Sequence, residues 1–222
     1  MLQLIKTKDG SLTIYNTEMD EHYHSINGAV QESLHVFIQA GLEEILKTKT
    51  NISILEVGLG TGLNFLLTLS RLSPTLSEGE GEHSVNYTAL EPFPIEKEFL
   101  KTIDYSTFVD TTEFQKIHDC EFNTSITLAE NFTFSKSDQK IQDITFNKTF
   151  DLVYYDAFGP RVQPEMWTLN IFEKLFAAMN PDSVFVTYCA KGEVKRFLKQ
   201  AGFIVETWQG PPGKREMVRG RK

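Results

Sequence analysis

Hydrophobic and polar positions alternate with two different periods along the chain. Apolar residues at helical spacing follow Gly28, and the run "SLTIY" upstream of them has the composition of a strand. Ile52–Gly58 is predicted to be a buried strand that ends in a glycine turn, and a leucine-rich helix is predicted to follow it as far as Leu72. The first fifty residues therefore form, in this interpretation, a strand and a helix ahead of a larger α/β unit.

The same alternation continues downstream. Further strands are predicted at Val85–Phe93, near Ile126 to Phe134, from Phe150 to a stop at Asp156, and at Ser183–Ala190. Helices are predicted at "NIFEKLFAAM" and at "GEVKRFLKQAG", the second closed by Gly202, while Ser73–His83 is predicted to be a polar loop and Asn180–Asp182 a turn. The last residues indicate a hairpin around the sequence Gly-Pro-Pro-Gly.

Strands that alternate with helices predict a mostly parallel sheet covered on both faces. A hairpin after the last helix is typical of the class I S-adenosylmethionine-dependent methyltransferases, whose Rossmann-like sheet ends with an antiparallel strand. We expect residues 51–222 to form such a domain and residues 1–50 to be an extension packed on it.

The turn Gly58-Leu59-Gly60-Thr61-Gly62 is predicted to present bare backbone to a ligand, with a tight strand-to-helix turn without a ligand as the alternative. A nucleoside triphosphate loop would continue with Lys and Ser or Thr, but Leu63 and Asn64 follow here. A dinucleotide fingerprint would have its last glycine one residue later. The acid before the turn, Glu56, would repel a pyrophosphate and attract the cationic sulfonium and ammonium of S-adenosylmethionine.

Two more acids end predicted strands. Glu91 can accept hydrogen bonds from ribose hydroxyls, although a capping or solvated role is the alternative. Asp156 can accept a proton from an attacking amine or orient it, with a helix cap as the alternative. Phe158 can form an apolar wall or a stacking face for a base, or it can be plain core.

Charge and cysteine content change this picture only slightly. The net charge of −8 argues against a nucleic-acid partner, but residues 191–222 carry nine Lys or Arg against three Glu. Such a basic end can direct one face toward phosphates, or it can be a solvated surface. Two cysteines are too few for a disulfide framework, and the start has no signal-peptide pattern, so we expect a reducing cytoplasmic location without a membrane anchor.

Four segments together resemble a known family. "EVGLGTGLNFL", "YYDAFGPRVQPEMWT", "AKGEVKRFLKQAGF" and "GPPGKREM" are similar to the methyltransferase domain of the bacterial tRNA 5-methylaminomethyl-2-thiouridine biosynthesis (MnmC-like) family. The opening from Asp9 to Ile38 resembles the free-standing form of that domain, and the similarity spans roughly residues 9 to 220, with a poorly matched middle third.

The resemblance implies an S-adenosylmethionine-dependent enzyme that converts 5-aminomethyl(-2-thio)uridine at the tRNA wobble position to its methylaminomethyl form. A separate flavin-dependent oxidase or another enzyme would then supply the aminomethyl intermediate, since the bifunctional form carries an oxidase domain after the methyltransferase. The implied roles are catalysis by Asp156 and substrate contacts by Phe158, Lys214 and Arg215. The implied cofactor residues are Glu56, Gly58, Gly60, Thr61, Gly62, Asn64, Glu91 and, on the adenine side, Asp138.

Three alternatives remain open at this point. His22 and His24 lack a third ligand at a suitable spacing, so no metal site is predicted, and Tyr23 or His24 either folds over the cofactor or packs. A methyltransferase or aminopropyltransferase acting on a small amine would share the glycine turn and the strand-end acid. A non-catalytic RNA-binding module on the same fold is the third possibility.

Overall fold

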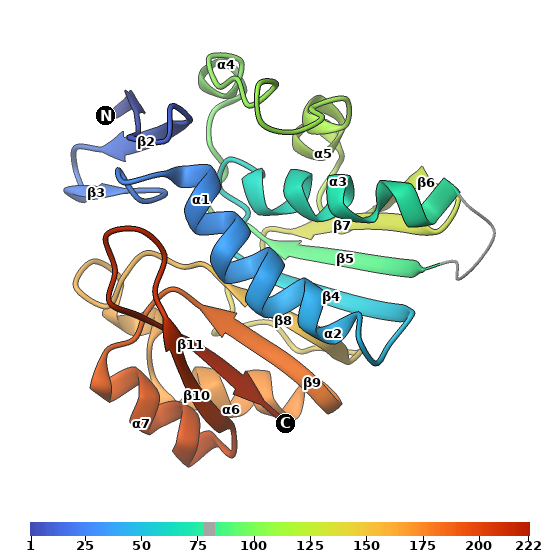
Figure 1. Ribbon diagram of the computed structural model, residues 1–222, viewed down its shortest axis with the longest axis vertical. Coiled ribbons are helices and arrows are strands. Elements are labelled where there is room, and N and C mark those ends of the chain that lie inside the picture. The colour runs from blue at the N-terminus through green and yellow to red at the C-terminus, as the bar shows by residue number, and fades with distance from the viewer. Residues whose placement is uncertain (78–82) are drawn as a thin grey trace.

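The central feature of the computed structural model, which describes residues 1–77 and 83–222 and no side chains from 73 to 77, is an eight-stranded sheet (Figure 1). Its strand order is β10-β11-β9-β8-β4-β5-β7-β6. The parallel strands are β4 (Asn51–Val57), β5 (Ser84–Leu90), β7 (Phe132–Ser137), β8 (Phe150–Tyr155) and β9 (Met179–Thr187). The predicted class I methyltransferase fold, including its antiparallel end, is confirmed.

Of the other three strands, the last strand of the chain and the edge strand beside β7 run antiparallel to this group, and the third runs parallel to it. β11 (Glu216–Arg221) inserts between β9 and β10 (Ile204–Gln209), which confirms the predicted terminal hairpin. β6 (Ser125–Ala129) pairs with β7 at the other edge. The sequence predicted one strand in that region, but it contains two, because the residues between Ala129 and Phe132 form a tight turn.

Helices cover both faces of the sheet, as Figure 1 shows. One face carries α3 (Leu63–Ser77) and a continuous N-terminal helix made of α1 (Ala29–Ser33), the π-helical segment η1 (Leu34–Leu42) and α2 (Glu43–Ile45). The other face carries α6 (Leu169–Ala177) and α7 (Gly192–Ala201). Gly202 closes α7 with φ +111°, the left-handed cap that the sequence predicted.

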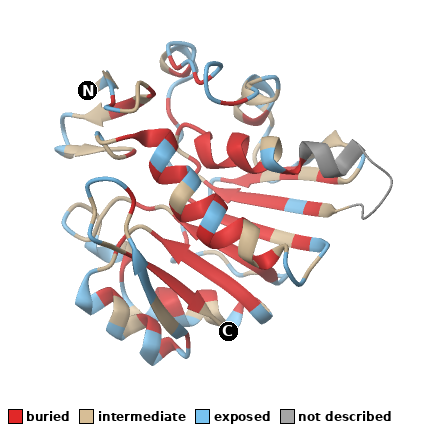
Figure 2. Cartoon of the chain, viewed as in Figure 1, coloured by how far each residue is buried: buried red, intermediate tan, exposed pale blue. Residues whose placement is uncertain are grey.

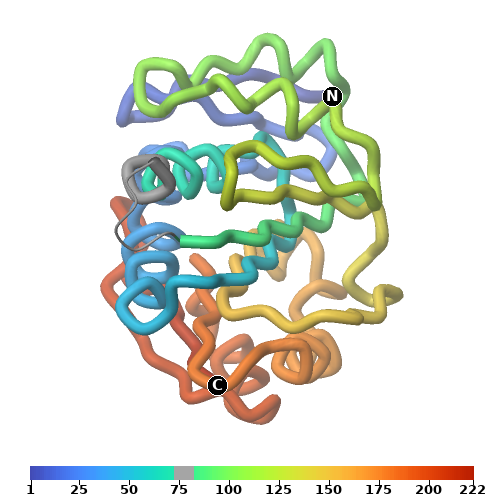
Figure 3. Tube along the Cα trace, turned by 90° about the vertical axis from the view of Figure 1, so that its right-hand side faces the viewer, coloured from blue at the N-terminus to red at the C-terminus, as the bar shows by residue number. Residues whose placement is uncertain are grey.

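The first residues form a small separate sheet of β1 (Leu2–Lys6), β2 (Leu12–Asn16) and β3 (Glu21–His22). In both Figure 1 and Figure 3 this sheet lies beside the segment that holds the short helices α4 (Lys97–Leu100) and α5 (Phe114–Asp119). Helices this short show no clear hydrophobic period, so neither was predicted from the sequence. Ile14, Val36 and Phe37 share one core with the sheet, and the division at residue 50 stays a prediction.

Two sequence predictions need correction. The predicted loop Ser73–His83 is partly helical, since α3 continues to Ser77, while residues 78–82 lie outside the described residues. The predicted turn Asn180–Asp182 lies within β9, where the pairing with β8 shifts register and Asp182 adopts φ +57°. A strand irregularity and a turn use the same residue types, so the sequence did not separate them.

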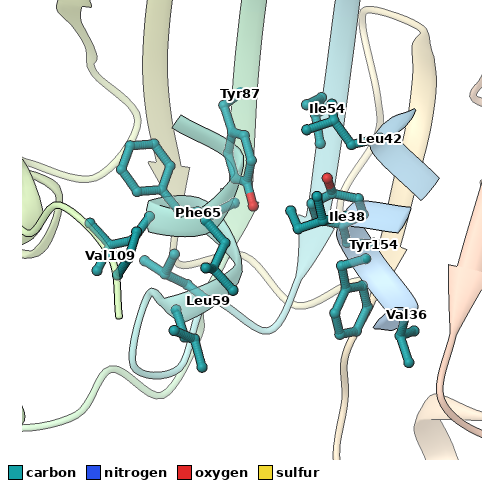
Figure 4. Close-up of a cluster of buried hydrophobic side chains, with 14 of the residues drawn as sticks. Val36, Ile38, Leu42, Ile54, Leu59, Phe65, Tyr87, Val109 and Tyr154 are labelled. Atoms are coloured by element: carbon teal, nitrogen blue, oxygen red, sulfur yellow. The ribbon is translucent and has the colours of Figure 1, made fainter. Parts of the chain in front are cut away.

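Aromatic side chains fill the core between α3 and the sheet. Figure 2 shows that the central strands are almost entirely buried, and Figure 4 shows Phe65 and Tyr87 within the cluster on this face. The Phe65 ring meets Phe134 and Tyr87 edge-on, with centroids 4.9 and 5.2 Å apart. Among the described residues, none of the helices is long and apolar enough to cross a lipid bilayer.

Replacing Phe65 by Ala should therefore lower the free energy of unfolding by about 3–5 kcal/mol, because the side chain is fully buried and a cavity would remain. Urea unfolding followed by circular dichroism measures this loss. The control Phe108→Ala removes a partly exposed ring and should cost less than about 1 kcal/mol. Equal losses in the two variants would contradict this account of the core.

Candidate active site

A cavity of about 1170 Å³ opens at the carboxyl ends of β4, β5 and β8. This is the edge of an open α/β sheet where ligands bind. Its floor is the turn after β4, and its roof comes from the N-terminal sheet and the residues that follow it. The lining includes Met1, Leu2, Asn16, Met19, Tyr23, His24, Gly58, Leu59, Gly60, Glu91, Phe93, Asp143, Asp156, Phe158 and Tyr188.

The glycine turn is shaped by close backbone approaches. Gly58 has φ +93°, and a Cβ there would lie 2.8 Å from the carbonyl oxygen of Asp156. Gly60 has φ +52°, and its Cβ would lie 3.2 Å from the Tyr23 ring. Both residues line the cavity, whereas Gly62 does not and packs instead against Ile117 and His118 of α5. Of the three predicted glycines, Gly58 and Gly60 therefore present backbone to the cavity.

Glu91 supports this turn from the end of β5. Its Oε2 accepts the Gly60 backbone N–H at 2.8 Å, and its Oε1 accepts the Phe93 N–H at 3.1 Å. Burial raises the pKa of the carboxyl, while these backbone hydrogen bonds lower it. The side chain lines the cavity, as the sequence predicted, and it also fixes the geometry of the turn.

Asp156 begins the loop after β8 and lines the same cavity. Its Oδ2 accepts a hydrogen bond from Asn64 Nδ2 at 2.8 Å, and its backbone N–H donates to Val57 at 3.0 Å. Burial, followed by the nearby charge of Glu32, raises the pKa of Asp156 to about 7, against the lowering effects of Asn64 and Lys214. A carboxyl with this pKa changes charge near neutral pH and can take up a proton there.

Asn64 and Glu56 form the polar layer behind Asp156. The Asn64 amide also donates to Glu56 Oε1 at 3.0 Å, and the Tyr87 hydroxyl donates to Glu56 Oε2 at 2.8 Å. Glu56 is fully buried and does not line the cavity, and burial raises its pKa well above the ordinary value. Neither Glu56 nor Asn64 lines the cavity; they hold Asp156 from behind, and their predicted contact with the cofactor stays a prediction.

Thr61 does not line the cavity either, and its predicted cofactor contact stays a prediction. Its Oγ1 accepts the Tyr105 hydroxyl at 3.0 Å and lies 3.1 Å from His24 Nε2. Burial lowers the pKa of His24 to about 4, so this imidazole is neutral and joins the roof to the turn. His22 stacks on Tyr15 instead, and among residues 1–77 and 83–222 no group of three or more His, Cys, Asp or Glu could hold a metal ion.

Phe158 and Tyr23 form an aromatic wall of the cavity. Their rings meet edge-on with centroids 4.9 Å apart, and the Phe158 carbonyl accepts the Trp167 indole N–H at 2.7 Å. Burial, followed by the charge of Glu91, raises the pKa of Tyr23 to about 12, so its hydroxyl stays protonated. The prediction that Phe158 lines the site agrees with this geometry.

The acid predicted on the adenine side, Asp138, has its place outside the cavity, and its role stays a prediction. Asp138 is exposed, accepts a hydrogen bond from Asn123 at 3.3 Å and does not line the cavity. Asp143, five residues further on, does line it. Sequence reasoning also missed Tyr188, although Tyr188 directly follows β9 and the rule that ligands bind at strand ends could have found it.

The two basic residues predicted at the rim behave differently from each other. Lys214 is half-buried, forms an ion pair with Glu32 and lies 3.8 Å from the centre of the Tyr188 ring. Arg215 is exposed, and within the described residues its guanidinium has neither a hydrogen bond nor an ion pair. Of these two residues, Arg215 therefore has its charge available to a phosphate, whereas the charge of Lys214 is paired with Glu32. The substrate contacts predicted for both residues stay predictions.

Curated proteins that are similar to this chain include two MnmC proteins. The chain is 29% identical over 222 residues to the tRNA 5-methylaminomethyl-2-thiouridine biosynthesis bifunctional protein MnmC of Idiomarina loihiensis, which covers 92% of this chain and 36% of that protein. It is 30% identical over 216 residues to the protein of the same name from Azoarcus sp., with 94% and 34% covered. The chain thus spans about a third of the length of these relatives.

Solved structures show the same fold. The crystal structure of MNMC2 from Aquifex aeolicus superposes with a TM-score of 0.81 at 26% identity, covering all of this chain and 70% of that one. Spermidine synthase from Thermotoga maritima superposes with a TM-score of 0.60 at 9% identity, which shows a shared fold alone. A family model described as S-adenosyl-L-methionine-dependent methyltransferase matches residues 97–222, more than half of the sequence. The chain belongs to this family of S-adenosyl-L-methionine-dependent methyltransferases.

Proposed function

We propose that this chain transfers a methyl group from S-adenosylmethionine to the primary amine of 5-aminomethyl(-2-thio)uridine at the wobble position of tRNA. Similarity to the MnmC proteins and to MNMC2 supports this choice of substrate. The observation that carries the proposal is Asp156, a carboxyl with a pKa of about 7 that lines the cavity directly beside the glycine turn.

The residues of the cavity fit S-adenosylmethionine. Gly58 and Gly60 leave space for a ligand to approach the backbone, Glu91 offers a carboxylate to ribose hydroxyls, and Asp143 offers one to an adenine amine. When bound, this cofactor supplies an activated methyl group. Glu56 and Asn64 enter the proposal as supports of Asp156, and Thr61 and Gly62 as supports of the turn, without contact to the cofactor.

The chain's own task is to present the amine with a free lone pair. An alkylammonium is mostly protonated at neutral pH, so a nearby acceptor must take its proton. Asp156 is ionised in part near pH 7 and can do so, and the Asn64 amide keeps its carboxylate in place. Phe158 and Tyr23 offer faces against which a base can pack.

The basic residues near the C-terminus differ in whether they have acidic partners, and this difference indicates where tRNA would bind. Lys195, Lys214, Arg219 and Arg221 are paired with acids, and Lys222 donates to two carbonyls. Lys191, Arg196, Lys199 and Arg215 are exposed, and within the described residues their charged groups have no hydrogen bond or ion pair. We assign phosphate contacts to Lys191, Arg196 and Arg215.

We also propose that this chain acts in the cytoplasm and that a separate enzyme produces the aminomethyl group of its substrate.

The central experiment incubates the chain with S-adenosylmethionine and tRNA that carries 5-aminomethyl-2-thiouridine, followed by nucleoside analysis. We expect methylaminomethyl product from the parent and a rate about 10²-fold lower from Asp156→Asn, which keeps the shape of the side chain and loses its basicity. Thermal unfolding checks that the variant is folded. Faster methylation of a free small amine than of tRNA would favour the small-amine alternative and refute the proposal.

Glu91→Gln should weaken the binding of S-adenosylmethionine more than roughly tenfold, because one amide oxygen cannot replace two carboxylate oxygens toward the Gly60 and Phe93 N–H groups. Isothermal titration calorimetry measures the affinity. Glu98→Gln, which changes an exposed acid of α4, is the matched control and should bind like the parent. Parent-like affinity in Glu91→Gln would remove this residue from the cofactor site.

Replacing Lys191, Arg196 and Arg215 together by Gln should weaken tRNA binding and reduce the slope of log Kd against log salt concentration by about 2–3, since fewer counterions are released. Filter binding at several salt concentrations gives this slope. The matched control replaces Lys47, Lys101 and Lys116, each paired with a nearby Glu, and should leave the slope unchanged. Equal slopes in the two triple variants would exclude this surface.

A further inference from the structure

Lys214 lies in the loop between β10 and β11, and its ammonium is directed inward. Its Nζ contacts Glu32 Oε1 and stands 3.8 Å from the centre of the Tyr188 ring. The Glu32 side chain is only 6% exposed and that of Lys214 31%. The positive charge of Lys214 therefore faces Glu32 and Tyr188 in the wall of the site, and it is not directed outward toward a phosphate.

The loop around Lys214 is closed by its own backbone hydrogen bonds and packs against Asn27, which precedes α1. The Gly210 N–H donates to Arg215 at 3.1 Å, and the Lys214 N–H donates to Pro211 at 2.9 Å. Gly213 approaches Asn27 so closely that a Cβ would lie 2.0 Å from the Asn27 amide nitrogen. These contacts fix the backbone of the loop, so the position of the Lys214 ammonium does not depend on its flexible side chain alone.

Glu32 of α1 is the acid that this ammonium meets. Its other oxygen, Oε2, accepts the Ser25 backbone N–H at 2.8 Å, which fixes the carboxylate in its buried position. The charge of Glu32 acts on Asp156, where it opposes ionisation, and Lys214 acts on Asp156 in the opposite direction. The two residues therefore exert opposite electrostatic effects on the same catalytic group.

Tyr188 connects the ion pair to the cavity. Its ring lies under the Lys214 ammonium, and its hydroxyl donates to the carbonyl oxygen of Ala157 at 2.8 Å, one residue beyond Asp156. Tyr188 itself lines the cavity. The ion pair, the ring and the backbone next to Asp156 thus form one packed unit.

We propose that the Lys214–Glu32 ion pair is a positioning element for Asp156, in which Lys214 cancels the negative charge of Glu32 so that Asp156 can ionise and accept the proton of the substrate amine. The inference rests on the proposed function of Asp156. The other groups that face Asp156 are Asn64 of α3, Glu56 of β4 behind that amide, and Tyr188 after β9. Of all these groups, Lys214 contributes the only positive charge.

The decisive measurement is the titration of the Asp156 carboxyl by carbon-13 NMR in the full chain, with the signal assigned by its loss in Asp156→Asn. Lys214→Met leaves the Glu32 charge uncompensated and should move the midpoint to higher pH by about 1 pH unit. Glu32→Gln should move it to lower pH, and the Glu32→Gln/Lys214→Met double variant should fall between the two. Lys214→Arg keeps the charge and should titrate like the parent.

A parent-like midpoint in Lys214→Met, or a double variant displaced as far as Lys214→Met, would overturn the inference. Should Lys214→Met fail to fold in a thermal unfolding check, Glu32→Gln decides alone, and an unchanged midpoint there would equally refute it. None of these results depends on tRNA, so they stand apart from a failure of the proposed function.

Activity gives an independent reading if the parent methylates tRNA. The Lys214→Met rate should be roughly 5-fold below the parent at pH 7 and recover to within about 2-fold at pH 9, because more Asp156 is then ionised. The titration of the substrate amine is common to all variants and cancels in this comparison. A loss of the same size at every pH would indicate a merely structural ion pair and contradict the proposal.

Discussion

The approach of β4 to β8 at their carboxyl ends is the constraint on which the site depends. The Asp156 N–H donates to the Val57 carbonyl, and the next residue, Gly58, passes so close to the Asp156 carbonyl that a Cβ would lie 2.8 Å away. One backbone contact therefore sets both the position of the proposed cofactor turn and that of the proposed proton acceptor. A side chain at Gly58 would push these two parts of the site apart, which links the strict geometry of the turn to the chemistry beside it.

Behind that contact lies a core that is more polar than its hydrophobic surroundings suggest. Glu56 is fully buried and is tolerated because Tyr87 and Asn64 both donate to it. Buried polar groups are costly unless they are hydrogen-bonded, so each partner here has a definite place. The Asn64 amide uses its two hydrogens on two acids, and it thereby transmits the rigidity of β4 to the carboxylate of Asp156.

The sequence was informative where one physical rule decides the outcome. Strand ends at a sheet edge located Glu91 and Asp156, and the glycine pattern located Gly58 and Gly60. It was less informative about direction. Thr61 and Glu56 are close in sequence to the glycines that line the cavity, but their side chains face Tyr105 and Tyr87. Neither periodicity nor spacing predicts the direction of a side chain in or beside a turn. Asp138 and Asp143 follow the same strand, and only the path of the loop decides which one reaches the cavity.

The antiparallel insertion of β11 has a consequence for the order in which the site is completed. Because β10 ends at the carboxyl edge of the sheet, the turn into β11 delivers Lys214 to Glu32, although the two are 182 residues apart in the sequence. Contacts of such separation form late, since the entropy of closing a long loop must be overcome first. During synthesis the glycine turn and Asp156 leave the ribosome well before the hairpin. The opposing charges of Lys214 and Glu32 thus meet only when folding is nearly finished, so an incompletely folded chain would hold the proposed proton acceptor beside an unbalanced negative charge.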